Sequence, residues 1–336
     1  MVKKLRVGHI GTKHDHSRDI VQCLEKFPEQ FEIIGIVEDD PKWRAEVEKT
    51  EPYLRHKFVT EEQLFNSDCD FIVCEGFEYD LTQAALRCVE NGIPVHIDKP
   101  AGHDIETFEK VLNISKAKSL PLQMGYMYRY NPAVVDCYNL VKSGQLGEIH
   151  SVTAIMSSDH SPEKRQWLDR FDEGIMFFLG CHMVDLIYMM QGRPDEVVPF
   201  LTRSNIFGCT AIDEATAIFK YKNGISIAQS NSTEIGGGGR RQLVVNGSLG
   251  SFEIRPLEYN GISKLTFATL ENGKLSYRYE KHEYPHMTYL ERYDDMMLDF
   301  AAMVRGEKEN HFTYDYELEC QKLVLAACGI KNEFLK

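Results

Sequence analysis

The tripeptide Asp98-Lys99-Pro100 combines an acid, a base and a rigid proline directly after the apolar run 94–97. Lys99 is therefore expected at the end of a buried strand, beside a carboxylate and before a ring that restricts the backbone. A lysine held in this way can donate or accept a proton in a reaction. The plainer alternative is a solvated lysine at a strand end, and the rest of the sequence has to decide between the two.

A second candidate group lies in the segment 180–185, where His182 precedes Asp185 by three positions. On a helix these two side chains share one face, and an imidazole oriented by a carboxylate is a competent proton donor or acceptor. The alternative is a histidine that belongs to the core, because the surrounding helix is strongly apolar.

Alternating strand and helix patterns position Lys99 in the first part of the chain. The expected strands are 5–11, 31–37, 71–74 and 95–97, and the expected helices include 20–27, 81–91 and 105–119. Repeated β-α units with continuously apolar strands predict a doubly wound parallel sheet, an α/β fold that binds ligands at the carboxyl ends of its strands. Gly11, Glu38 and Lys99 all fall at such ends.

The segment Gly11-Thr12-Lys13-His14-Asp15-His16 replaces the second and third glycines of a G-x-G-x-x-G nucleotide fingerprint. Side chains at those two places hinder the approach of pyrophosphate and the packing of the helix, although Lys13 could itself hold a phosphate. Glu38 lies 22 positions after His16, near the spacing expected of the acid that binds an adenosine ribose. A carboxylate there repels a 2′-phosphate and so favours NAD over NADP. An acidic turn or helix cap at 38–41 is the alternative.

Composition limits the kinds of partner that this chain can have. A length of 336 residues fits two domains, and the formal net charge of −13 disfavours nucleic acid and anionic membranes. Nine cysteines without a C-x-x-C pair indicate a reducing compartment. Because neither a leader pattern nor an apolar run of membrane-spanning length is present, we expect a cytoplasmic protein with a small-molecule ligand.

An ordered set of motifs extends over nearly the whole chain. It comprises Gly11, Glu38, Asp98-Lys99-Pro100, Arg129-Tyr130-Asn131-Pro132, Gly144-x-x-Gly147 and Gly180-x-His182-x-x-Asp185. This order resembles the Gfo/Idh/MocA family of NAD(P)-dependent oxidoreductases. The resemblance implies a Rossmann domain at 1–125 and an α+β domain at 126–336, with a large open, mainly antiparallel sheet and last helices that pack back on the first domain. Strand patterns at 216–221, 225–230 and 243–245, separated by Asn-Gly turns, agree with it.

The resemblance also implies roles for individual residues. Lys99 matches the lysine of the family's Glu-Lys-Pro motif, and His182 matches a histidine that exchanges the proton of the reacting hydroxyl while the nicotinamide takes the hydride. The residues expected to bind cofactor are Gly11, Thr12, Lys13, His14, His16, Glu38 and Lys99; those expected to bind substrate are Tyr128, Arg129, Asn131, His182 and Asp185. The expected substrate is a sugar, inositol or related polyol, the cofactor NAD rather than NADP, and the assembly a homodimer or homotetramer.

Two departures from the family pattern keep other functions open. Phe178 stands where many members carry an aspartate, and the glycine fingerprint is altered. A non-catalytic relative that senses a sugar or nucleotide is one alternative. Another is a metal-dependent enzyme whose ligands are His14, Asp15, His16 and His182, with zinc or manganese as the ion. A capping or anion-binding turn explains the His14–His16 segment more simply, so no metal is expected.

Overall fold

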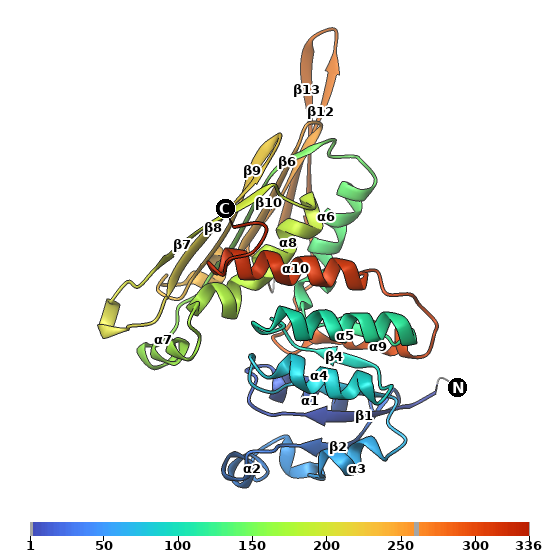
Figure 1. Ribbon diagram of the computed structural model, residues 1–336. Helices are drawn as coiled ribbons and strands as arrows, with labels where there is room; N and C mark the ends of the chain where they lie inside the picture. Colours follow the sequence, from blue (N-terminus) through green and yellow to red (C-terminus); the bar gives the residue numbers. More distant parts are fainter. Residues whose placement is uncertain (1–2, 259–261, 336) are drawn as a thin grey trace. The chain divides into compact units, whose positions relative to one another are not determined.

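The computed structural model describes residues 3–258 and 262–335 (Figure 1). The chain divides into two compact units. The first comprises Met1–Met127 and Leu290–Gln321, and the second comprises Tyr128–Tyr289 and Lys322–Lys336.

The first unit contains a five-stranded parallel sheet. Its strands are β1 (Leu5–Ile10), β2 (Phe31–Val37), β3 (Phe71–Cys74), β4 (Val95–Ile97) and β5 (Leu122–Met124). They lie in the order β2-β1-β3-β4-β5, and every neighbouring pair is parallel. The chain therefore reverses its direction of travel across the sheet between β1 and β3, which is where ligands bind in open α/β sheets.

The first unit also contains helices, most of which connect these strands. They are α1 (Ser17–Lys26), α2 (Pro41–Val47), α3 (Glu61–Phe65), α4 (Leu81–Glu90), α5 (Ile105–Lys118) and α9 (Asp294–Val304), with short turns η1 (Tyr53–Arg55) and η7 (Glu291–Tyr293). The helices α4 and α5 pack beside one another (Figure 1). Asp40, in the acidic segment expected to form a turn or cap, is the N-cap of α2 and accepts from the amides of Lys42 and Trp43.

The second unit contains an eight-stranded mixed sheet in the order β13-β12-β11-β10-β6-β9-β8-β7. The pair β6–β9 is parallel, and the other neighbours are antiparallel. The strands are β6 (Ile149–Ser157), β7 (Glu196–Thr202), β8 (Glu214–Tyr221), β9 (Gly224–Asn231), β10 (Gln242–Gly247), β11 (Gly250–Ile254), β12 (Ile262–Glu271) and β13 (Lys274–Glu283). The β12–β13 hairpin projects from one edge of this sheet (Figure 1).

Helix α8 (Cys181–Gln191) packs on β6 and β9. The other helical segments of this unit are α6 (Pro132–Lys142), α7 (Pro162–Trp167), η3 (Leu168–Arg170), η4 (Met176–Gly180), η5 (Ile206–Gly208) and η6 (Gly237–Arg240). Helix α10 (Tyr314–Ala327) and turn η2 (Met127–Tyr130) each contain residues of both units.

The predicted fold class, a doubly wound parallel sheet followed by a large, mainly antiparallel one, is confirmed. Predicted and observed helices differ by one to three residues at their ends; for example, the helix expected at 20–27 spans Ser17–Lys26, and the helix expected at 81–91 ends at Glu90. All nine cysteines are free thiols. Among the residues that the structure describes, none of the helices combines the length and the apolar character that crossing a bilayer requires.

Candidate functional site

The candidate site of the first unit lies where β1, β3 and β4 end. The hydrogen-bond ladder continues one residue past the strands, because the amide of Glu75 donates to Ile10 O at 2.8 Å and the amide of Asp98 donates to Cys74 O at 3.2 Å. Parallel pairing thus sets the residues that follow β3 and β4 side by side. Glu75 and Asp98 are both buried at this edge.

Gly11 allows the loop after β1 to pass close to the loop after β3. Its φ of +83° is a conformation that favours glycine, and a Cβ there would lie 2.4 Å from backbone atoms of Gly76. Any other residue would force the two loops apart. The first glycine of the fingerprint is therefore required by the fold itself.

Glu38, at the end of β2, is bonded to the loop after β1. Its Oε2 accepts from the amide of Thr12 at 3.0 Å and from the hydroxyl of Thr12 at 2.6 Å. Its Oε1 accepts from the amide of Asp40 at 3.1 Å. The indole of Trp43 donates to the Thr12 hydroxyl at 2.9 Å and orients it. A carboxylate offers about four acceptor positions, so Glu38 retains capacity for one further donor such as a ribose hydroxyl.

A cavity of about 300 Å³ opens beside Glu38. Its polar lining is mainly acidic, with Glu38, Asp39, Asp40 and Asp80 against Lys13 and Arg87. The ammonium of Lys13 pairs with Asp40 at 2.8 Å. The cavity suits a neutral or hydroxyl-bearing group better than an additional phosphate.

Most of the loop amides that the glycine fingerprint would offer to pyrophosphate already have acceptors. The amide of Gly11 donates to Val37 O at 2.8 Å, and that of His14 donates to Glu75 O at 3.1 Å. The amide of Thr12 is taken by Glu38, and that of His16 donates to Nδ1 of His14 at 3.1 Å. A dinucleotide bound here would depend more on side chains, and less on backbone amides, than a dinucleotide bound by an unaltered glycine fingerprint.

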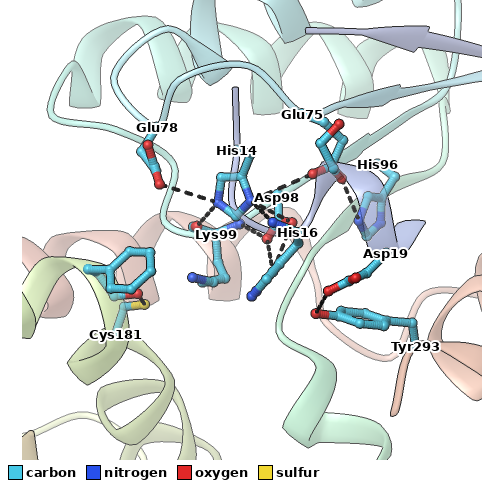
Figure 2. A network of polar contacts seen from close by, with 12 residues as sticks. His14, His16, Asp19, Glu75, Glu78, His96, Asp98, Lys99, Cys181 and Tyr293 are labelled. Carbon is cyan, nitrogen blue, oxygen red and sulfur yellow. Dashed lines mark hydrogen bonds and ion pairs between the residues drawn. The ribbon is translucent and has the colours of Figure 1, made fainter. Parts of the chain in front are cut away.

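His14 and His16 both turn toward Asp98 (Figure 2). Nδ1 of His14 lies 3.1 Å from Oδ2 of Asp98, and Nδ1 of His16 lies 3.1 Å from the same oxygen. Nε2 of His14 lies 3.0 Å from the carbonyl oxygen of Lys99 and donates to it. The role of the two imidazoles toward phosphate stays a prediction; in the structure both have Asp98 as an acidic partner.

Three further buried polar side chains, missed in the sequence, surround this group (Figure 2). Oε2 of Glu75 lies 3.7 Å from Nδ1 of His14, and Oε1 of Glu78 lies 3.8 Å from Nε2 of the same ring. Nε2 of His96 lies 4.0 Å from Oε1 of Glu75. Because Glu75 directly follows the expected strand 71–74, the rule that placed Lys99 at a strand end could have found it.

Burial and mutual charge shift the protonation of this cluster. Burial and then the Asp98 charge raise the pKa of Glu75 well above its usual value. Burial alone would raise the pKa of Asp98, but the His14 and His16 imidazoles outweigh it and hold the pKa well below the usual value. Burial lowers the pKa of His16 to about 3, whereas the pKa of His14 is raised because nearby carboxylates outweigh burial. Within this cluster, Glu75 and His14 therefore keep a proton more readily than usual, whereas Asp98 and His16 lose theirs more readily.

Lys99 is fully buried immediately after this group. The backbone amide of Lys99 donates to Oδ1 of Asp98 at 2.6 Å. The neighbouring acid therefore fixes the backbone of Lys99. The plainer alternative of a solvated lysine is therefore wrong. Its catalytic role stays a prediction.

The second unit contains the residues expected to bind substrate. His182 lies in the first turn of α8, buried, with its ring edge-on to Tyr128 at 5.0 Å between centroids. The guanidinium of Arg129 donates to both oxygens of Asp185, at 2.7 Å from Nη2 to Oδ1 and 3.0 Å from Nε to Oδ2. Asn131 caps α6 and donates to Leu257 O at 3.0 Å. These contacts orient Tyr128 with His182 and Arg129 with Asp185, and they fix Asn131 to the backbone.

A network around Glu258 was missed in the sequence. Oε1 of Glu258 accepts from the hydroxyl of Tyr128 at 2.7 Å, and Oε2 pairs with Arg241. Arg241 also donates to Ser157 O and to the hydroxyl of Ser158, both at 3.1 Å. Glu258 follows β11 and Arg241 precedes β10, a pairing that only the sheet order reveals.

Phe178 lies in the π-helical turn η4, directly before α8. It is buried, stacks on Phe171 with centroids 5.6 Å apart, and meets Trp167 edge-on at 4.9 Å. The position that is aspartate in many members of the resembled family is thus part of an aromatic cluster.

Comparison with known proteins agrees with this architecture. The sequence model of the Gfo/Idh/MocA C-terminal domain matches residues 134–253. YteT of Bacillus subtilis, described as a putative oxidoreductase, is 23% identical over 54% of this chain and 45% of its own length. Inositol 2-dehydrogenase 2 of Saccharopolyspora erythraea is 22% identical over 57% of this chain and 56% of its own. The chain thus spans about half the length of these curated relatives.

The fold is shared over the full length with solved structures. A levoglucosan dehydrogenase in complex with NADH and levoglucosan superposes with a TM-score of 0.79 at 15% identity, covering 97% of this chain and 98% of that one. The sequence match over residues 134–253 and the weak but extended similarity to curated relatives make this chain a distant match to the Gfo/Idh/MocA family of oxidoreductases.

Proposed function

We propose that this protein is an NAD-dependent oxidoreductase that transfers a hydride between nicotinamide and a hydroxyl-bearing carbon of a sugar, inositol or related polyol. One observation is the main support: Glu38 and Lys99 lie just after strands β2 and β4 of one parallel sheet, and a cavity opens beside Glu38. Relatives that act on inositol and a fold neighbour that binds levoglucosan support the substrate class.

The residues of the first unit fit the adenosine half of NAD. The remaining acceptor position of Glu38 suits a ribose hydroxyl, and the acidic lining of the cavity repels a 2′-phosphate. Lys13 would leave Asp40 to meet the pyrophosphate, since both side chains are partly exposed. NAD is therefore the expected cofactor rather than NADP.

Lys99 and His182 are the proposed acid–base groups. The nicotinamide supplies a hydride acceptor at its ring. The hydroxyl proton of the substrate would pass to one of these two side chains, so that a carbonyl remains. The substrate pocket would be lined by Tyr128, Arg129, Asn131 and Asp185. The ion pair between Arg129 and Asp185 would fix the positions of these two side chains.

Equilibrium titration with NAD and NADP, combined with absorbance of reduced nicotinamide across a polyol panel, tests the proposal. We expect tighter binding of NAD than NADP and turnover with at least one polyol. A second candidate is a relative that binds a sugar or nucleotide without hydride transfer. It is favoured because most amides of the loop after β1 already donate to acceptors within the protein and are not free for pyrophosphate. Binding without turnover of any polyol would favour that sensor, and absence of dinucleotide binding would contradict the oxidoreductase.

We also propose a homodimer or homotetramer. The β12–β13 hairpin exposes Leu270, Leu275, Tyr277 and Tyr279 to solvent, each by more than half of its surface. An apolar patch on a sheet edge usually needs a cover. Light scattering after size exclusion should give at least twice the chain mass, and Tyr279→Lys with Leu275→Lys should lower it. A monomer at all concentrations would contradict this proposal.

A further inference from the structure

We propose that His14, His16, Asp98 and Glu75 bind one divalent transition-metal ion of the zinc class. Nδ1 of each histidine and one oxygen of Asp98 already lie close enough to share an ion. Glu75 lies beside this group, and its side chain would move toward the ion to supply the fourth ligand. This site goes beyond the proposed oxidoreductase function, because hydride transfer between nicotinamide and a polyol needs no metal ion, and His14 and His16 were expected only to bind the cofactor.

The spacing of the first three ligands fits a single ion. Their ligand atoms all lie within 4.8 Å of one another, and both imidazole nitrogens lie 3.1 Å from Oδ2 of Asp98. With bonds of about 2.1 Å, neighbouring ligand atoms lie about 3.0 Å apart around an octahedral ion and about 3.4 Å apart around a tetrahedral one. The observed 3.1 Å falls between these values.

Nε2 of His14, the nitrogen that would not bind the ion, already has the kind of hydrogen-bond acceptor that is common behind metal-bound histidines. Nε2 donates to the carbonyl oxygen of Lys99 at 3.0 Å, which leaves the lone pair of Nδ1 facing Asp98. Ligating histidines commonly donate their other nitrogen to a carbonyl or carboxylate in this way. The amide of His16 now donates to the same Nδ1 at 3.1 Å, so an ion would displace that hydrogen bond.

Glu75 provides an independent observation. Its side chain is fully buried beside that of Asp98, and burial and then this second acid raise its pKa well above the usual value. The nearest imidazole nitrogen is Nδ1 of His14, 3.7 Å from Oε2. Two neighbouring buried acids are costly to ionise together, and a cation shared between Glu75 and Asp98 would stabilise both carboxylates.

The charges around the cluster also favour a cation. Glu75, Glu78 and Asp98 bring three buried carboxyl groups together around the His14 imidazole, beside the ammonium of Lys99. Two imidazoles with carboxylates form a donor set that suits zinc and other first-row ions rather than calcium or magnesium. A bound ion would tie the loop between β1 and α1 to the ends of β3 and β4.

Elemental analysis of protein purified without a polyhistidine tag, dialysed against zinc and then against metal-free buffer, tests the site. We expect about one zinc ion per wild-type chain. His16→Gln and Glu75→Gln should each reduce the bound zinc at least tenfold, whereas Asp15→Asn, which changes the exposed neighbour of both histidines, should retain it. Circular dichroism verifies that each variant is folded.

Cobalt substitution gives a readout that does not depend on activity. Co²⁺ bound by two imidazoles and carboxylates should give visible absorption bands that zinc abolishes and His16→Gln removes. The proposal is overturned if the folded wild-type protein retains no zinc or cobalt, or if folded His16→Gln and Glu75→Gln retain as much as wild type. NAD binding is measured separately, so a failed metal site leaves the oxidoreductase proposal standing.

Discussion

Nδ1 of His16 lies 3.1 Å from Oδ2 of Asp98, although 82 positions separate the two residues in the chain. The contact exists because β1 and β4 flank β3, so that the loop after β1 reaches the end of β4. It links the altered fingerprint loop to the backbone that carries Lys99.

Replacing Lys99 by methionine should lower turnover about 10²–10⁴-fold, the usual contribution of a positioned acid–base group. Dissociation constants for NAD should stay within a few-fold, because the side chain acts on the proton and not on adenosine. Steady-state kinetics and titration measure both quantities, and the exposed Lys116→Met on α5 is the matched control. Full activity in folded Lys99→Met protein would remove Lys99 from the mechanism.

Changing Glu38 to glutamine should weaken the preference for NAD over NADP about tenfold, since the charge that repels a 2′-phosphate is lost while the side-chain shape is kept. The ratio of the two dissociation constants is the measurement. Asp39→Asn is the control, because Asp39 lines the same cavity. An equal change in both variants would show that general acidity, rather than the position of Glu38, sets the preference.

Phe178→Asp should lower the free energy of unfolding by about 3–5 kcal/mol, because it empties part of an aromatic cluster and buries a carboxylate. Phe178→Leu should cost less, about 1–2 kcal/mol, because most of the apolar volume is kept. Urea unfolding measures both. If the aspartate variant were as stable as wild type, the position would have to be open to water, contrary to its contacts with Trp167 and Phe171.

The free energy of unfolding should fall as the pH drops below 6.5, in part because of His9. Burial and then the His56 charge lower the pKa of His9 from 6.5 to about 3. Between these values the unfolded chain binds a proton that the folded chain does not, and stability is lost toward acid. A difference of 6.5 − 3 units at about 1.4 kcal/mol each gives an upper bound of about 5 kcal/mol.

His9→Leu should flatten this part of the stability curve, measured by urea unfolding at a series of pH values. The substitution leaves the hydroxyl of Ser17 bonded to that of Tyr53 at 2.7 Å. His311→Leu, at an exposed histidine, should leave the slope unchanged. A slope in His9→Leu as steep as in wild type would mean that other groups account for the acid lability.

Local patterns were sufficient to predict the elements of the first unit and the strand ends that carry Gly11, Glu38 and Lys99. Strand and helix periodicity depends on neighbours in the sequence, and the edge at which parallel strands end follows from their common direction. Glu75 was overlooked although the same rule applied to it. The bonds from Glu38 to Thr12 could not be foreseen, because they depend on how closely the loops after β1 and β2 approach.

The sequence by itself determined the alternation of strands and helices and the fold class, because these follow from residue types and their periodicity. The candidate acid–base residues stay a prediction. Only the tertiary structure decided that His14 and His16 face Asp98, that Arg129 binds Asp185, and that Phe178 joins an aromatic cluster. Such pairings depend on strand order and packing between segments that are distant in the chain, and the local pattern does not encode these distances.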